Sequence, residues 1–128
     1  MSISSAKRAL AQSVKWFDPR RRQAGTWAFI LNRITGIGLT VYLFMHLAVL
    51  STLARGPEAY DRFIALAKSP PFVVGELLVV VGGLYHGLNG LRVACTSFGI
   101  GVPQQQRLFF ILVALVAVVG LIFAVRMF

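Results

Sequence analysis

Three long apolar stretches constrain the fold of this chain more than any other feature. They run over about 27–53, 72–98 and 107–126 of its 128 residues. A helix needs roughly 20 apolar residues to cross a bilayer, and each stretch reaches or approaches that length. Backbone groups in lipid must be hydrogen-bonded within their own segment, so each stretch is expected to be helical. The sequence therefore predicts an all-α integral membrane domain over residues 26–128, with three transmembrane helices.

Residues 1–25 are predicted to form a basic N-terminal arm on the cytoplasmic side. They hold six of the 13 Lys and Arg residues and contain no apolar core of a signal peptide. A net charge of +9 would suggest nucleic acid binding in a soluble protein. Ahead of apolar spans, it instead predicts a cytoplasmic N-terminus and a C-terminus on the outer side of the cell (inner) membrane, with no nucleic acid partner. The arm is expected either to lie on lipid headgroups or to dock a soluble partner.

Helix breakers divide the apolar stretches. They lie at Gly56-Pro57, Pro70-Pro71, Gly99, Gly101 and Pro103. Between the first two pairs, residues 58–68 are predicted to form an amphipathic interfacial helix. The single cysteine excludes an intrachain disulfide and a metal site made of cysteines alone.

Polar residues within the spans are the candidates for function, because an ionisable group inside a bilayer is costly. His86 lies at mid-depth in the second span. Residues four apart share a helix face, so Gly82, His86 and Gly90 form one row. A face without side chains leaves room for a flat group such as haem, for which histidine is a common axial ligand. It also lets another helix approach closely, with His86 as an interfacial residue, and the spacing alone leaves both interpretations open.

His46 lies toward the outer end of the first span, on a polar stripe with Asn32 and Thr35. At 1.5 Å per residue, it lies roughly 12 Å deeper from the inner surface than His86. Two axial nitrogens on one iron lie only about 4 Å apart, from bonds near 2 Å each. If both histidines bind iron, they therefore bind different haems. The chain has only two histidines, so a partner membrane subunit would supply the other ligands.

Two arginines lie at the inner ends of the spans. Arg33 belongs to the first span and Arg92 to the second. Each is expected either to extend to the headgroups or to pair with a haem propionate or a quinone carbonyl. Glu76, near the outer surface, is either a solvated terminus or a proton-handling group.

Three motifs resemble one family. Asn32-Arg33-Ile34-Thr35-Gly36, Gly56-Pro57-Glu58-Ala59-Tyr60 and the segment from Tyr85 to Arg92 occur in the order found in the C-type cytochrome b membrane-anchor subunit of succinate dehydrogenase (respiratory complex II) and related fumarate reductases. The resemblance covers roughly residues 15–126. It implies a bundle of three transmembrane helices, packed with a second membrane-anchor subunit, that binds haem b and reduces quinone. An iron–sulfur subunit and a flavoprotein with FAD complete the complex.

The resemblance also implies roles for individual residues. His86 matches an axial haem ligand, and Arg33 matches an arginine beside the quinone and the haem propionates. Asn32, Thr35 and Arg92 are placed in the same vicinity. No catalytic residue is expected in this chain, and it should have no activity alone.

Two positions depart from the family pattern. Asn32 replaces the usual histidine, and Phe29 stands where some members have a quinone-contacting serine. His46 resembles the first-span ligand of diheme members. We therefore expect two haems b, shared with the partner subunit, rather than one. The alternatives are a haem-free structural anchor and a small oligomeric transporter that uses Glu76.

Overall fold

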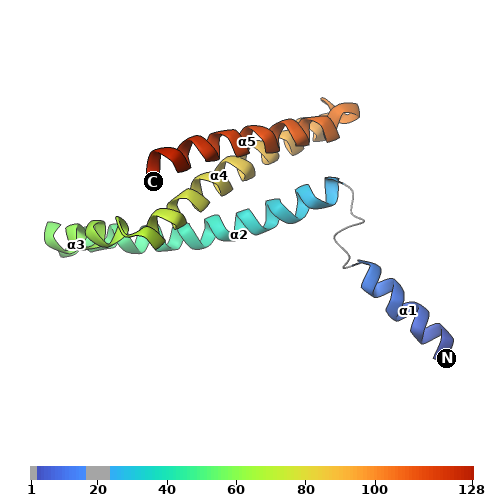
Figure 1. Ribbon diagram of the computed structural model, residues 1–128, viewed down its shortest axis with the longest axis horizontal. Helices are drawn as coiled ribbons and strands as arrows, with labels where there is room; N and C mark the ends of the chain where they lie inside the picture. The colour runs from blue at the N-terminus through green and yellow to red at the C-terminus, as the bar shows by residue number, and fades with distance from the viewer. Residues whose placement is uncertain (1–2, 17–23) are drawn as a thin grey trace.

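The computed structural model describes residues 3–16 and 24–128, and these are helical apart from short turns (Figure 1). The elements are α1 (Ile3–Trp16), α2 (Ala24–Ser51), η2 (Thr52–Arg55), α3 (Pro57–Ala67), α4 (Pro70–Ser97), η3 (Val102–Gln104) and α5 (Gln105–Met127). Three continuous helical segments are long and apolar enough to cross a membrane: Ala24–Arg55, Pro70–Ser97 and Val102–Met127. The predicted all-α fold with three spans is confirmed.

The N-terminal arm contains a helix that the sequence analysis did not predict. Apolar residues at positions 3, 6, 10 and 14 recur at helical spacing, and this was the signal for α1. Part of the predicted arm, including the run Arg20–Arg22, lies outside the described residues. The interfacial helix predicted over residues 58–68 corresponds to α3.

The breakers seen in the sequence lie at helix ends. Pro57 and Pro70 occupy the first turns of α3 and α4, where a missing N–H costs nothing. After α4 the chain reverses at Gly99, which has φ of 80°. The N–H of Ile100 donates to the carbonyl of Cys95 at 2.9 Å, and that of Gly99 to Thr96 at 3.0 Å. This Schellman arrangement satisfies carbonyls that would otherwise end α4 unpaired.

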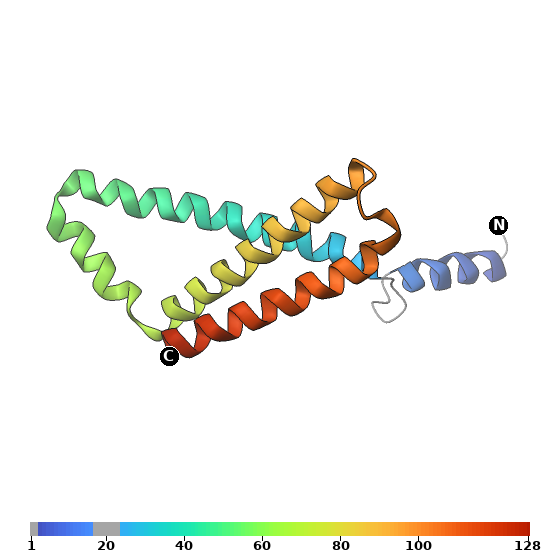
Figure 2. The same ribbon diagram turned by 90° about the horizontal axis from the view of Figure 1, so that it is seen from above.

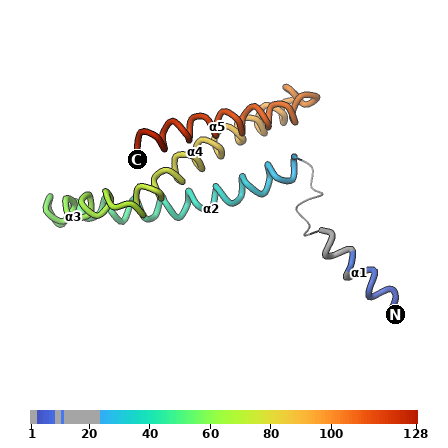
Figure 3. Tube along the Cα trace, in the orientation of Figure 1, coloured from blue at the N-terminus to red at the C-terminus, as the bar shows by residue number. Residues whose placement is uncertain are grey.

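α4 is the central helix of the membrane domain, because it packs against both α2 and α5. Figure 2 shows α2 and α4 crossing and then diverging toward α3, which joins their separated ends. Figure 3 traces the same path along the chain. The contacts between α2 and α4 run from Ala28 with Tyr85 to Leu39 with Gly83.

The small core lies where the three long helices meet. It consists of Ala28, Tyr85, Phe109, Leu112 and Val116. The buried residues of α5 recur every three or four positions and so define one face toward α4. The sequence did not indicate which face of α5 is buried, because α5 is apolar all round.

The second half of α2 extends beyond this core. Its large apolar side chains are exposed along the helix, including Val41, Phe44 and Leu47. Within a membrane these side chains contact lipid or another membrane protein.

We predict that a side chain at Gly120 separates α4 from α5. A Cβ atom there would lie 2.9 Å from Cγ2 of Val81, a short and stiff side chain. Gly120→Leu is expected to destabilise the domain by about 1–3 kcal/mol, as overpacking does. The measurement is the thermal unfolding midpoint of the intact membrane complex in detergent. Gly75→Leu is the control, since nothing lies within 4 Å of its Cβ position, and equal midpoints for the two variants would contradict the prediction.

Candidate functional site

His86 of α4 is held against the backbone of α2. Its Nδ1 lies 3.1 Å from the carbonyl oxygen of Asn32 and 3.3 Å from the hydroxyl of Thr35. The Thr35 hydroxyl itself donates to the carbonyl of Leu31 at 2.8 Å. A carbonyl only accepts, so Nδ1 carries the proton and donates it. With the proton of the neutral imidazole on Nδ1, Nε2 is the ring nitrogen that can bind a metal.

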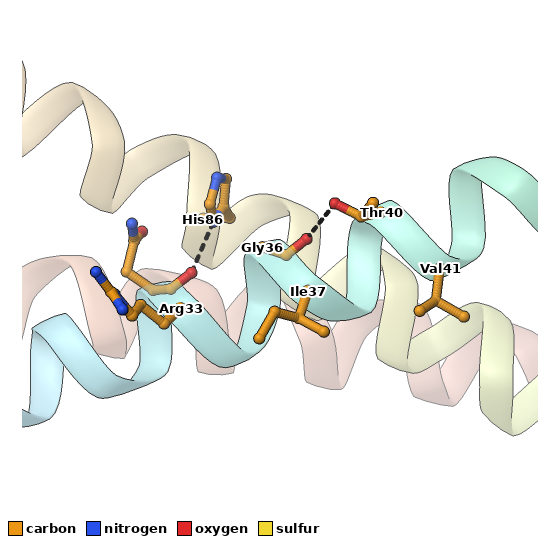
Figure 4. Close-up of a pocket in the computed structure, with 7 residues that line it drawn as sticks. Arg33, Gly36, Ile37, Thr40, Val41 and His86 are labelled. Carbon is orange, nitrogen blue, oxygen red and sulfur yellow. Dashed lines mark hydrogen bonds between the residues drawn. The ribbon is translucent and has the colours of Figure 1, made fainter.

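Glycine on α2 makes this approach possible. A Cβ atom at Gly36 would lie 3.1 Å from Cε1 of His86, closer than ordinary van der Waals contact. Figure 4 shows the imidazole reaching from α4 over Gly36. Gly82, one turn before His86, lies against Cγ2 of Thr35 in the same crossing. The small residues that the sequence placed beside His86 thus serve partly to let the two helices meet.

A hydrogen-bonded chain continues from this crossing to the end of α4. Asn89, which is 1% exposed, donates from Nδ2 to Oδ1 of Asn32 at 3.2 Å. Its own Oδ1 accepts from Nε of Arg92 at 3.1 Å. Both ends of the buried amide are therefore paired, as a polar group inside a membrane domain requires.

An open groove of about 510 Å³ lies beside His86. It is lined by Asn32, Arg33, Gly36, Ile37, Thr40 and Val41 of α2 and by His86 of α4. Figure 4 shows His86 beside the labelled residues of α2. The volume is in the range of cofactor and small-molecule pockets, roughly 300–1,000 Å³. The groove is open on one side, so its remaining wall must come from lipid, a ligand or a partner.

The predicted site residues are only partly gathered here. Asn32, Arg33 and His86 line the groove, and Thr35 contacts His86. Arg33 is exposed, with its guanidinium carbon 4.8 Å from the ring centre of Phe29. Arg92 is connected to Asn32 through Asn89 but lines a different pocket.

His46 lies apart from the groove, on the exposed half of α2. Its ring stacks on that of Tyr42, with centroids 5.6 Å apart. Ten residues separate it from Gly36, which amounts to about 15 Å along the helix. In the part of the chain that the structure describes, no three His, Cys, Asp or Glu side chains come together as a metal site.

Two structural residues of the site were not singled out as such from the sequence. Asn89 fell only within the motif from Tyr85 to Arg92, yet it connects two predicted site residues, Asn32 and Arg92. Tyr85 is buried, and its hydroxyl donates to the carbonyl of Ala28 at 3.0 Å. Their spacing in the sequence was the signal for a shared role. Tyr85 and Asn89 are four residues apart, so both lie on the face of α4 that meets α2.

Comparison with known proteins places this chain in a family. Residues 8–124 match the family model described as succinate dehydrogenase/fumarate reductase transmembrane subunit. The chain belongs to this family. It is therefore a membrane anchor subunit of the succinate dehydrogenase/fumarate reductase family, integral to the membrane, and such a subunit works with partner subunits.

Individual relatives of the family show similar identity to the chain, whereas the share of their length that the match covers differs. The chain is 32% identical over 123 residues to the succinate dehydrogenase hydrophobic membrane anchor subunit of Halobacterium salinarum, covering 93% of this chain and 90% of the relative. It is 33% identical to a succinate dehydrogenase 2 membrane subunit of Mycobacterium tuberculosis, over 69% and 65% of the two chains. It is 32% identical to the succinate dehydrogenase cytochrome b558 subunit of Bacillus subtilis, over 64% and 42%.

We predict that the family fold in this chain depends on Asn89. Asn89→Leu removes a buried amide and leaves Oδ1 of Asn32 and Nε of Arg92 without their partners. The expected loss is about 1–3 kcal/mol, which is the usual cost of unpaired buried polar groups. Ser97→Ala is the control, because that exposed hydroxyl bonds only within α4. Thermal midpoints of the two complexes that differ by less than the measurement error would refute this role.

Proposed function

We propose that this subunit binds haem b through Nε2 of His86. The observation that carries the proposal is the hydrogen bond from Nδ1 of His86 to the carbonyl of Asn32. Histidines that bind metals through one ring nitrogen commonly donate the other N–H to a backbone carbonyl, which fixes the tautomer and the ring orientation. No described residue hydrogen-bonds to Nε2, and the imidazole borders the open groove.

The residues around His86 fit such a group. In its neutral form, with the proton on Nδ1, the imidazole offers Nε2 as a nitrogen ligand. Glycine at position 36 and the glycines of α4 keep bulky side chains away from it, and a Cβ at Gly87 or Gly90 would meet nothing within 4 Å. Bound haem would supply one-electron redox chemistry, which belongs to the cofactor rather than to the protein. The chain would contribute the His86 nitrogen that binds the iron and an apolar wall.

We further propose that His46 binds a second, outer haem b. It is separated from the level of His86 by about 15 Å along α2, too far to share one iron. It lies on the exposed half of α2, where a second membrane-anchor subunit would supply the opposite ligand. The stacked ring of Tyr42 restricts the orientation of the imidazole.

Arg33 is proposed to act on the anionic or carbonyl groups of the ligands. Its side chain borders the groove of His86, and contact with Phe29 positions the guanidinium over an aromatic face. There it would neutralise a haem propionate and donate hydrogen bonds to a quinone carbonyl. Asn32 and Thr35 hold His86 in place beside it.

The partners follow from this role. We propose an iron–sulfur subunit at the end of the bundle that carries Arg33, with a flavoprotein holding FAD beyond it. The basic N-terminal arm favours a cytoplasmic N-terminus and an outer C-terminus. The chain itself performs no catalysis in this scheme. It anchors the soluble subunits and completes the site where quinone is reduced.

The haem content of the complex tests the assignment of both histidines. We expect two haems b per flavin in the complex purified from native membranes, measured as pyridine haemochrome. His86→Ala should lose the inner haem and His46→Ala the outer one, because each variant removes an iron ligand. One haem per flavin, unchanged in His46→Ala, would reduce His46 to a structural residue.

A haem-free structural anchor is the second candidate function. It is favoured by the observation that His86 already bonds α2 and so joins two helices without iron. A complex that contains flavin and no haem would establish this alternative. The transporter alternative is set aside by the family membership.

A separate prediction concerns Arg33. Arg33→Gln should lower succinate:quinone activity by about tenfold, as expected when a charged hydrogen-bond donor is removed. Succinate oxidation with a soluble artificial electron acceptor should stay unchanged, since the flavoprotein is intact. Arg126→Gln removes the same charge from the other end of the bundle and should affect neither activity. Equal quinone activity in both variants would exclude Arg33 from the quinone site.

A further inference from the structure

A second pocket lies where the ends of three helices meet, apart from the groove of His86. Its volume is about 280 Å³, and more of its lining is polar than apolar. It is bordered by the beginning of α2, the end of α4 and the turn that leads into α5. The lining includes Gly25, Arg92, Pro103, Gln105, Gln106 and Phe109. Neither the haem nor the quinone proposal uses this pocket.

Arg92 is held rigidly at the pocket. Its Nε donates to Oδ1 of Asn89 at 3.1 Å, and one Nη lies 3.5 Å from the carbonyl oxygen of Gln105. Its guanidinium carbon lies 5.7 Å from the ring centre of Phe109. A guanidinium has five N–H donors in a fixed plane, so donors remain for a ligand in the pocket.

The charge of Arg92 is not neutralised within the described part of the chain. No lining residue is acidic, and the guanidinium makes no ion pair there. The carboxylates of Glu58, Asp61 and Glu76 lie on α3 and the second turn of α4, at the opposite end of the bundle. Asp18, the fourth acidic residue, lies outside the described residues. A half-buried guanidinium with fixed donors and no acidic side chain in its described surroundings is suited to an oxyanion such as phosphate.

The position of the pocket favours a phosphate that belongs to a lipid. It lies at the ends of membrane-spanning helices, near Trp27, which is 39% exposed, and next in sequence to the exposed Arg107. Trp and Arg at helix ends are typical of the headgroup level. Two exposed apolar side chains at this end, Val102 in the lining and Phe110 outside it, lie where acyl chains would run. Basic pockets between transmembrane helices bind anionic headgroups in this way.

We propose that this pocket binds the phosphate of an anionic phospholipid headgroup. Arg92 supplies charge-assisted hydrogen bonds, and the side-chain amides of Gln105 and Gln106 supply further donors. The lipid would fasten the turn before α5 to the beginning of α2. It would also hold Arg92 in the orientation in which Arg92 bonds Asn89.

Photolabelling of the intact complex in neutral detergent tests the proposal. The probe is phosphatidylglycerol with a diazirine beside its headgroup, and the labelled peptides of this chain are mapped by mass spectrometry. Label is expected within residues 102–110. Unlabelled phosphatidylglycerol should compete for the site at least tenfold better than phosphatidylcholine. Competition by millimolar inorganic phosphate equal to that by the lipid would make free phosphate the ligand and overturn the proposal.

Two variants and one control assign the site. Arg92→Gln should reduce labelling by about tenfold, since it removes a charged donor. Gly25→Leu should also reduce it, because its Cβ meets nothing within 4 Å and the side chain has room to enter the pocket while Arg92 is unchanged. Arg107→Gln removes a nearby charge outside the pocket lining and should leave labelling within about twofold.

Three further results would overturn the proposal. Equal losses in Arg92→Gln and Arg107→Gln would indicate general attraction of lipid to a basic surface. Unchanged labelling in Gly25→Leu and Arg92→Gln would place the lipid elsewhere. Unchanged labelling together with lower haem content in Arg92→Gln would assign Arg92 to a haem propionate instead.

Discussion

The crossing of α2 and α4 depends on polar groups that lipid cannot satisfy. Inside a bilayer the hydrophobic effect contributes little free energy to helix association, so packing and hydrogen bonds decide which faces meet. Here Tyr85, His86 and Asn89 of α4 all bond to α2, two of them to backbone carbonyls. Gly36 permits the approach, since a Cβ there would lie 3.1 Å from the imidazole.

This crossing divides α2 into two halves with different roles. The first half packs on α4 and provides Asn32 and Thr35 to the site. The second half, which carries His46, leaves its apolar side chains exposed to the membrane. The three helices are therefore an incomplete bundle. A subunit of a membrane complex is expected to expose such a surface, because the partner completes it.

Asn89 separates two pockets of different character. On one side is the groove of His86, walled by glycine and apolar side chains of α2. On the other is the polar pocket of Arg92, where the ends of the three helices meet. One buried amide bonds to a residue of each pocket. A change in one pocket that moves the Asn89 side chain would also alter its hydrogen bond to the residue of the other pocket.

The sequence by itself determined the three spans, the short helix between the first two and the turns, because bilayer thickness and helix breakers act locally along the chain. It also singled out His86, Arg33 and Asn32, because polar residues in a span are few and costly, and these three line one groove. It did not determine which face of α5 is buried, since that helix is apolar all round. Only the tertiary structure decided this face, the tautomer of His86 and the separation of Arg92 from the groove. Each depends on which helix faces meet, and that is set by contacts between different helices, such as the bonds from α4 to α2 that join residues more than 50 positions apart.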